Sequence, residues 1–239
     1  MYDAIGSPEN NHMALVIGDL HGNLAKAQAF LNYEPDVEHI CLGDYVDSFT
    51  EAPERQLECL KLLIDSDAVL LWGNHDIHYL PNSPWICSGF QPKMAGAFKE
   101  IFSDAFEKGR IMAAYAVDEW LCTHAGVHPY MTDKPMKPAQ AAEALNQAFH
   151  DQLHEGRGPL FYVSPGRGGS NLFGGLFWFD PFREGVDPCE QVGRQVFGHT
   201  ERKEPHVTDR WACIDTTNAL PCWVFDTLSG KAFMIPYLT

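Results

Sequence analysis

The stretch that decides the fold is Leu71-Trp72-Gly73-Asn74-His75-Asp76. An apolar run, Ala68–Trp72, ends at a glycine, and the polar residues after it can bind a metal, donate a proton or orient a neighbour. Two earlier stretches repeat this arrangement, namely Gly18-Asp19-Leu20-His21-Gly22 after Leu15–Ile17 and Gly43-Asp44-Tyr45-Val46-Asp47 after Ile40–Leu42. Three strands that each end in glycine followed by cation-binding side chains predict one polynuclear metal site.

Strands and helices alternate through the first third of the chain. Strands are predicted at Met13–Ile17, Glu38–Leu42 and Ala68–Trp72. Helices are predicted between them at Leu24–Leu31 and Pro53–Ile64, with Thr50 as a candidate N-cap ahead of Pro53. Short strands that alternate with helical segments favour an α/β layout with parallel pairing.

The remaining two thirds mix both kinds of element. The sequence predicts helices at Asp76–Leu80, Ala95–Lys108 and Pro138–Leu153, and strands at Ile111–Val117, Trp120–Thr123, Val196–Phe197, Trp211–Ile214, Cys222–Phe225 and Ala232–Ile235. Between them, the glycine-rich stretch Gly156–Gly175 is predicted to be a long irregular loop, and such loops are usually functional or mobile. Since no linker interrupts this order, residues 1–239 are expected to form a single domain.

Composition narrows the class of protein. Hydrophobic content of 45% and aromatic content of 12% are typical of a globular chain. Seventeen basic against 32 acidic residues give a net charge of −15, which argues against extended contact with a nucleic-acid backbone. A small phosphorylated ligand or a phosphoprotein remains compatible with this charge, because bound metal ions can outweigh a distant field.

Compartment and membrane contact are also predicted from the sequence. No apolar run approaches the roughly 20 residues that span a bilayer, so no membrane association is expected. The polar N-terminal residues lack the pattern of a signal peptide. Seven cysteines without a C-x-x-C pair, several in apolar runs, indicate core thiols in a reducing compartment, so a cytoplasmic location is expected. The sequence leaves the oligomeric state open.

The candidate ligands share a position after an apolar run and beside a glycine. They are Asp19, His21, Asp44, Asn74, His124 and His199. Asp19 and His21 are two residues apart, so in extended backbone both side chains point the same way and can reach one ion. Asp44 could bridge two ions with its two oxygens. Mixed imidazole and carboxylate ligands suit Mn, Fe, Co, Ni or Zn better than Mg or Ca.

Charge counting indicates the chemistry of such a centre. Two carboxylates, Asp19 and Asp44, against two divalent ions leave about two positive charges uncancelled. That surplus attracts a phosphate dianion and lowers the pKa of a bridging water, so that hydroxide becomes the nucleophile. His75, next to Asn74, could then protonate the leaving alkoxide, and Asp47 could orient its ring.

Five short motifs follow one another along the chain: Gly-Asp-Leu-His-Gly, Gly-Asp-Tyr-Val-Asp, Gly-Asn-His-Asp, His-Ala-Gly and Gly-His. In sequence and order they resemble the motifs of the calcineurin-like metallophosphoesterases. The chain most resembles their phosphoprotein phosphatase branch and its relative, symmetrical diadenosine tetraphosphatase. The resemblance implies a four-layer α/β/β/α sandwich with a dinuclear centre, for which Mn²⁺ is our first choice. Asp19, His21 and Asp44 would then hold one ion, and Asp44, Asn74, His124 and His199 the other, with His75 as the acid and Asp47 as its partner.

One residue departs from the family pattern. Ser48 stands where the family usually has an arginine that grips the phosphate, directly after Asp47. Arg167, in the glycine-rich stretch, is our first candidate for a substitute, because glycines let the backbone approach a phosphate and arginine supplies a bidentate fork. Arg183 and Arg194 are the reserve candidates.

Three interpretations of the chain's function follow from this pattern, two enzymatic and one not. The first is a phosphomonoester, including phosphoserine or phosphothreonine in proteins, and Trp178-Phe179-Asp180-Pro181 resembles a segment of protein phosphatases. The second is a dinucleoside polyphosphate, which the ending Gly-Asn-His-Asp favours. The third is a catalytically idle binding scaffold of the same fold.

Other phosphatase chemistries fit the sequence less well. Asp65-Ser66-Asp67 matches a loose aspartyl-phosphate pattern, but it follows a run with helical spacing where that chemistry needs a buried strand. Cys189 and Arg194 stand one residue too close together for a cysteine phosphatase loop. His78 matches no motif position and is expected to be a surface or core residue.

Overall fold

The computed structural model describes residues 13–216 and 222–236, so the polar N-terminal residues lie outside these ranges. Its first sheet has the strand order β11-β10-β1-β2-β3-β4. The strands are β1 (Ala14–Ile17), β2 (Glu38–Cys41), β3 (Val69–Leu71), β4 (Ile111–Met112), β10 (Cys222–Asp226) and β11 (Lys231–Ile235). β1 to β4 are parallel, whereas β10 runs antiparallel to β1 and to β11. The expected parallel pairing of the first three strands is therefore confirmed.

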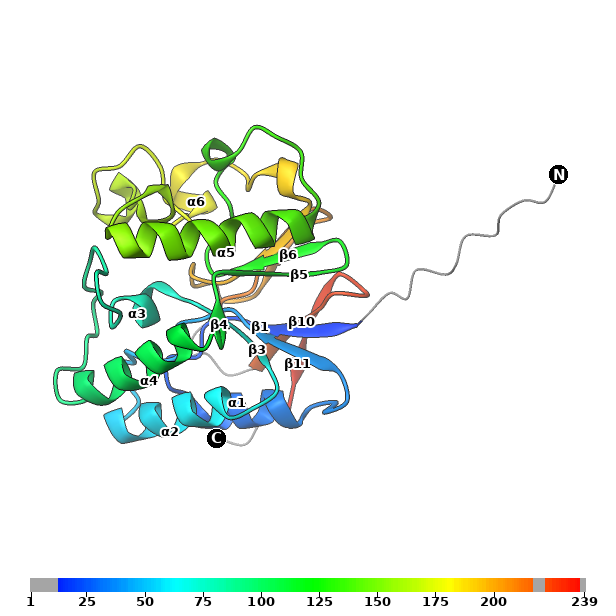
Figure 1. Ribbon diagram of the computed structural model, residues 1–239. Coiled ribbons are helices and arrows are strands. Elements are labelled where there is room, and N and C mark those ends of the chain that lie inside the picture. Colours follow the sequence, from blue (N-terminus) through cyan, green and yellow to red (C-terminus); the bar gives the residue numbers. More distant parts are fainter. Residues whose placement is uncertain (1–12, 217–221, 237–239) are drawn as a thin grey trace.

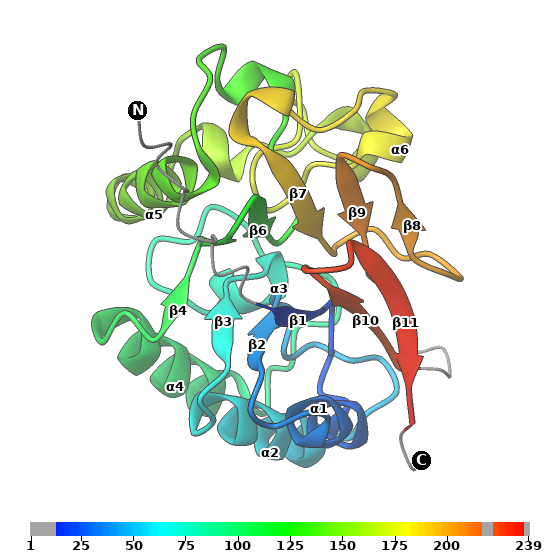
Figure 2. The same ribbon diagram turned by 90° about the vertical axis from the view of Figure 1, so that its right-hand side faces the viewer.

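The second sheet has the order β5-β6-β7-β9-β8. Its strands are β5 (Ala114–Val117), β6 (Trp120–Thr123), β7 (Arg194–Phe197), β8 (His206–Val207) and β9 (Trp211–Cys213). β6, β7 and β9 are parallel, and the two edge strands run antiparallel to their neighbours. Figure 2 shows the strands of each sheet side by side.

Helices cover the outer faces of both sheets (Figure 1). α1 (Leu24–Asn32), α2 (Pro53–Ile64) and α4 (Ala95–Glu107) lie on the side of the first sheet, and α5 (Pro138–Glu155) and α6 (Pro181–Glu184) on the side of the second. Side chains of β1 alternate accordingly: Leu15 and Ile17 join the core under the helices, while Ala14 and Val16 join the core between the sheets. The predicted α/β/β/α layering is confirmed.

The predicted strand Ile111–Val117 is wrong as a single element. β4 pairs with β3 in the first sheet, and β5 pairs with β6 in the second, so the chain crosses between the sheets at Ala113. Asn146 of α5 stabilises this crossing: its Oδ1 accepts the N–H groups of Ala113 and Ala114 at 2.7 and 3.1 Å, and its Nδ2 donates to the carbonyl of Ala114 at 2.8 Å. Both halves are apolar, so periodicity alone could not show the break.

Some local predictions also need correction. Thr50 does not cap α2, which begins after Ala52 without a side-chain cap. Ser48 instead organises this turn, since its Oγ accepts the N–H groups of Thr50 and Glu51. The helix expected at Asp76–Leu80 starts earlier, as α3 (Asn74–Ile77).

Three other expectations, on Asp65, the glycine-rich stretch and the cysteines, are confirmed. Asp65 forms the C-cap of α2, as expected of a helix end. Within Gly156–Gly175 the structure has short 3-10 turns at Pro159–Phe161 and Pro165–Arg167 and otherwise irregular backbone. All seven cysteines are free and buried. Among the described residues, no helix has the length and apolar character needed to cross a bilayer.

Candidate metal centre

The candidate ligands lie on loops that follow the carboxyl ends of strands. Asp19 and His21 follow β1, Asp44 and Asp47 follow β2, and Asn74 and His75 follow β3. Because these strands are parallel neighbours, their carboxyl ends meet at one edge of the sheet. In the second sheet His124 follows β6 and His199 follows β7, which are also parallel neighbours. The two sheets thus bring one set of loops together.

The backbone of these loops is strained where the ligands sit. Four of the polar residues adopt left-handed backbone, with φ of 43° at His21, 54° at Asp44, 65° at Asp47 and 64° at His199. For a residue with a Cβ this conformation costs about 1–3 kcal/mol, and it persists only where the surrounding structure holds it. Such strain typically gathers at functional sites.

Asp19, His21 and Asp44 form the first candidate group, with ligand atoms within 4.8 Å of one another. Nε2 of His21 lies 4.0 Å from Oδ2 of Asp19 and 3.8 Å from Oδ2 of Asp44. The Nδ1–H of His21 donates to the carbonyl of Val46 at 2.8 Å. In the neutral ring Nε2 therefore carries the lone pair, and it faces the two carboxylates, as a metal ligand requires.

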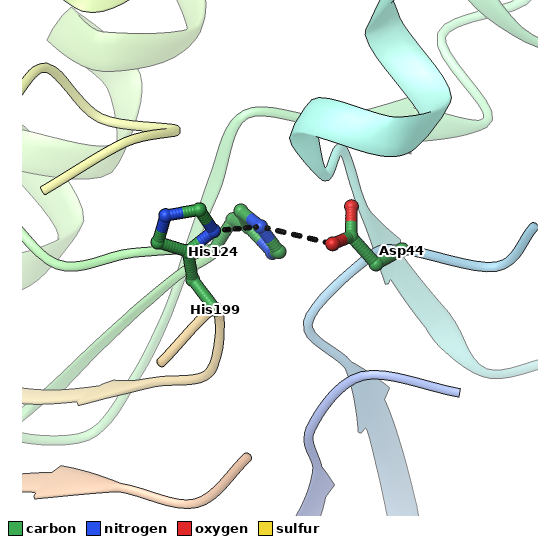
Figure 3. A group of neighbouring side chains, drawn as sticks. All are labelled: Asp44, His124 and His199. Carbon is green, nitrogen blue, oxygen red and sulfur yellow. Dashed lines mark hydrogen bonds and ion pairs between the residues drawn. The ribbon is translucent and has the colours of Figure 1, made fainter. Parts of the chain in front are cut away.

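Asp44, His124 and His199 form the second group (Figure 3). Nε2 of His124 lies 3.5 Å from Oδ2 of Asp44 and 3.2 Å from Nδ1 of His199. It also lies 2.8 Å from Oδ1 of Asn74. Since the Nδ1–H of His124 donates to the carbonyl of Leu42 at 2.8 Å, the lone pair on Nε2 points at an oxygen that also bears lone pairs. A cation between them removes this repulsion, so the donor set fits a metal.

Ionisation in this region also fits a pair of cations. Burial lowers the pKa of His124 to about 4, and burial together with the nearby Arg167 charge lowers the pKa of His199 well below its usual value. Both rings are therefore neutral at pH 7, the form that binds metals. Burial, and then the charges of Asp19 and Asp76, raise the pKa of Asp44 well above its usual value. Two divalent ions would offset this crowding of negative charge.

Asp76 organises the loops behind the ligands. Its Oδ2 accepts the N–H groups of Asp44 and Gly73 at 2.8 and 2.9 Å, and its Oδ1 accepts the N–H of Tyr45 at 2.8 Å. It lies three residues after Gly73, the N-cap of α3, so it caps this helix and ties the β2 loop to the β3 loop. Tyr45 is fully buried and belongs to the core.

His75 and Asp47 form a pair beside the ligand groups. Nδ1 of His75 lies 3.1 Å from Oδ2 of Asp47, and its backbone N–H donates to Oδ1 of Asp44 at 2.9 Å. Asp47 is fully buried. Burial lowers the pKa of His75, and the hydrogen bond to Asp47 works against that shift. The structure therefore places His75 next to the carboxylate that was expected to orient it.

All the candidate ligands except His124, together with His75 and Asp47, line one cavity of about 650 Å³. Arg167 and Arg183 line it as well. Arg194 does not, because its guanidinium stacks on the ring of Trp120, 4.0 Å from the centroid. Asp180 lines the cavity and is fully buried; it caps α6 and pairs with Nη2 of Arg167 at 2.9 Å and with Nε of Arg183 at 3.3 Å.

Sequence reasoning missed further residues of the cavity wall. Arg202 lines the cavity, and its guanidinium lies over the ring of Phe182, 4.1 Å from the centroid. Unlike Arg167 and Arg183, it forms no ion pair with any described carboxylate. Arg202 lies three residues after the candidate ligand His199, and this closeness in sequence was the one signal that could have predicted its place in the cavity wall. Phe49, two residues after Asp47, also lines the cavity, and its side chain is 78% exposed.

Two candidate ligand groups that share Asp44 lie at the edge of two stacked sheets, and a carboxylate-paired histidine, His75, lies beside them. The chain belongs to the calcineurin-like phosphoesterase family, whose model matches residues 13–200. Proteins of this family use two metal ions, and the structure offers residues that could hold them.

Comparison with known proteins adds relatives of several kinds. A Caenorhabditis elegans protein named "Putative serine/threonine-protein phosphatase" is 31% identical over 120 residues, which cover 48% of this chain and 26% of that protein. The match therefore spans about a quarter of that relative's length. This match agrees with the family that the family model shows.

Solved structures share the fold at low identity. A cold-active protein-tyrosine phosphatase of a Shewanella species has a TM-score of 0.59 at 12% identity, over 94% of this chain and 80% of that one. A protein serine/threonine phosphatase from Saccharomyces cerevisiae has a TM-score of 0.56 at 13% identity, over 97% and 82%. A structure titled as a putative diadenosine tetraphosphatase has a TM-score of 0.54 at 15% identity, over 98% and 97%.

Proposed function

We propose that this chain hydrolyses phosphomonoesters, including phosphoserine and phosphothreonine in proteins, at a centre of two divalent metal ions. The observation that carries the proposal is the sharing of Asp44 between two ligand groups, in a cavity that His75 also lines. When bound, the ions would offset the charge of the phosphate and lower the pKa of the attacking water.

The chain's own residues would divide the remaining work. Asp19, His21 and Asp44 would hold one ion, and Asp44, Asn74, His124 and His199 the other. His75 would give a proton from Nε2 to the leaving oxygen while Asp47 holds its Nδ1. With Ser48 engaged in its own turn, the guanidinium groups at the cavity wall would grip the phosphate, with Arg167 as our first candidate and Arg202 as an addition.

The metal and the compartment are part of the same proposal. Carboxylate, amide and imidazole ligands together favour Mn²⁺, with Fe, Zn, Co or Ni as alternatives. Seven free, buried cysteines support a reducing, cytoplasmic location.

A dinucleoside polyphosphate is the second candidate substrate, and the size of the cavity favours it. About 650 Å³ exceeds what one phosphoryl group fills, and Arg202 supplies a positive charge that no described carboxylate pairs. A polyphosphate chain longer than one phosphoryl group would fill more of this cavity and would interact with the charge of Arg202.

A substrate panel tests these proposals. We expect the purified, Mn²⁺-loaded chain to hydrolyse p-nitrophenyl phosphate and a phosphoserine peptide with higher kcat/KM than diadenosine tetraphosphate. The reverse order would replace the first candidate by the second. No turnover of any of the three with Mn²⁺, Fe²⁺, Zn²⁺, Co²⁺ or Ni²⁺ would leave the binding scaffold as the correct interpretation.

A further inference from the structure

Asp47 is held by more than its contact with His75. Its Oδ2 lies 3.1 Å from Nδ1 of His75 and also 2.7 Å from Nε2 of His78, and its Oδ1 accepts the hydroxyl of Tyr79 at 2.6 Å. His78 and Tyr79 directly follow α3, and both are buried. The expectation that His78 belongs to the surface or core is met only in part, since it contacts the carboxylate beside the proposed acid.

The hydrogen bond of Tyr79 has only one available direction. An ionised carboxylate only accepts, so the Tyr79 hydroxyl donates to Asp47, while its oxygen accepts the backbone N–H of Gln91 at 3.1 Å. The ring is fixed by stacking on Phe90 and Phe102, with centroids 5.3 and 6.0 Å away. Tyr79 therefore presents a fixed donor to one oxygen of the carboxylate.

The ring of His78 is oriented by the same loop. Its Nδ1 accepts the backbone N–H of Cys87 at 2.8 Å, so the neutral ring carries its proton on Nε2. That nitrogen is buried and lies 2.7 Å from Oδ2 of Asp47, an ion-pair distance, although its N–H makes no well-aligned hydrogen bond among the described residues. Cys87 and Gln91 thus direct two different side chains at one carboxylate through their backbone amides.

The segment Cys87–Gln91, which we call the supporting loop, also packs against the backbone of Asp47. Gly89 has a φ of +79°, and a Cβ there would lie 2.7 Å from the carbonyl oxygen of Asp47. The side-chain amide of Gln91 donates to the carbonyl of Ser48 at 3.2 Å and to that of Gly89 at 3.0 Å. The loop therefore encloses the residue that orients His75.

We propose that Tyr79 and His78 are positioning residues, which hold the Asp47 carboxylate so that Nε2 of His75 faces the leaving oxygen. This inference rests on the proposed function, in which the ester P–O bond breaks as the leaving oxygen takes the Nε2 proton of His75 and an oxygen from water bonds to phosphorus. The same contacts keep Asp47 ionised: burial alone would raise its pKa, but its contacts with His75, His78 and Tyr79 lower the pKa below its usual value.

Positioning of an acid has a consequence that a general structural role lacks. A leaving group that is stable as an anion, such as p-nitrophenolate, needs little protonation, whereas an alkoxide needs much. Loss of Tyr79 or His78 should therefore slow the hydrolysis of alkyl phosphates selectively.

Tyr79→Phe tests this with one hydroxyl removed and the ring retained. With the Mn²⁺-loaded enzyme we expect kcat for phosphoserine peptide to fall about 10-fold, a part of the ~10²–10⁴-fold that general acids supply. KM for the peptide and kcat for p-nitrophenyl phosphate should stay within about twofold. Tyr115→Phe is the matched control, because its hydroxyl donates to Glu38, away from the cavity.

Two substitutions at His78 distinguish a hydrogen-bonding role toward Asp47 from a role in filling space in the core. In His78→Gln the side-chain amide can still accept from Cys87 and donate to Asp47, so it should retain more of the peptide rate than His78→Leu. Equal losses of both variants on both substrates would mean that His78 only fills space, and would overturn its part of the inference.

Imidazole NMR gives a readout that does not depend on turnover. We expect the Nδ1–H proton signal of His75, assigned by its disappearance in His75→Asn, to exchange faster with water in Tyr79→Phe than in Tyr115→Phe. Unchanged exchange together with equal rate losses on both substrates would overturn the inference. If instead His75→Asn itself shows no preference for one leaving group, the acid role of His75 fails, and the positioning role fails with it.

Discussion

The backbone N–H of His199 donates to Oδ1 of Asp19 at 2.9 Å, although the two residues are 180 positions apart in the chain. Asp19 follows β1 in the first sheet, and His199 follows β7 in the second. A carboxylate of one ligand group is therefore oriented by a residue of the other group. Displacement of either loop disturbs both groups, so we expect the two metal positions to be filled or lost together.

Asp44 is the residue common to both groups, and Asp44→Asn tests that expectation. We expect the bound metal to fall from two ions per chain to less than one, measured by mass spectrometry of the desalted protein. Affinity should fall more than ~100-fold, because loss of an outer partner alone typically costs ~10–100-fold. Asp151→Asn, on the exposed face of α5, is the control. Retention of one tightly bound ion would show that the groups act independently.

Gly73 tests how closely the loops approach one another. A Cβ at Gly73 would lie 2.2 Å from Oδ1 of Asp44 and 2.3 Å from its backbone N, so Gly73→Ala should displace this ligand and abolish metal binding. Gly96→Ala is the matched control, since a Cβ at this position of α4 meets no atom. It should raise the free energy of unfolding by about 0.5–1 kcal/mol in chemical denaturation. If the Gly73→Ala variant still bound its full complement of metal, the close packing of Gly73 against Asp44 would be contradicted.

Metal binding should release protons, and the stabilisation of the folded chain by the metal should increase with pH. The pKa of Asp44 is raised in the folded, metal-free chain, so that state binds more protons than the unfolded one and loses stability as pH rises above 3.8. Metal ions replace the proton, so the increase in Tm caused by Mn²⁺ should be larger at about pH 8 than at about pH 5. His124, with a pKa of about 4, contributes no proton at neutral pH.

Calorimetry in two buffers of different ionisation enthalpy would count the protons released as Mn²⁺ binds. An increase in Tm that stays constant across this range, with no proton release, would contradict the assigned shift of Asp44.

Substitution of the cavity arginines should affect the stability of the folded chain to different extents. Arg167 pairs with the fully buried Asp180, so Arg167→Ala should lower the free energy of unfolding by up to about 3 kcal/mol as well as impair activity. Arg202 is exposed and pairs with no carboxylate within residues 13–216 and 222–236, so Arg202→Gln should leave Tm unchanged and raise KM several-fold. Intact kcat and KM in Arg167→Ala would remove it as the phosphate grip.

Local pattern was enough to predict where the loops with the candidate ligands lie. Asp19, Asp44 and Asn74 each follow an apolar strand and lie beside a glycine, so the sequence alone assigns them to one edge of a parallel sheet. The folding of sequence-distant segments was not predictable in this way. Tyr79 and His78 meet Asp47 only because the supporting loop, which has no periodic pattern, returns to α3.

Two other features escaped prediction for physical reasons of their own. The break at Ala113 lies inside a run that is apolar on both sides, so nothing in its periodicity marks a change of sheet. Ser48 and Thr50 are both good caps, and only the tertiary position of the turn decides that Ser48 accepts the amides.

The crossing at Ala113 also bears on how the folded chain comes apart. A single residue joins the sheets there, while the proposed second metal site would take Asp44 and Asn74 from one sheet and His124 and His199 from the other. Ions bound across this seam would have to be released before the sheets separate, so they would raise the barrier to unfolding. The metal-loaded chain should consequently persist much longer in denaturant than its equilibrium stability without metal implies.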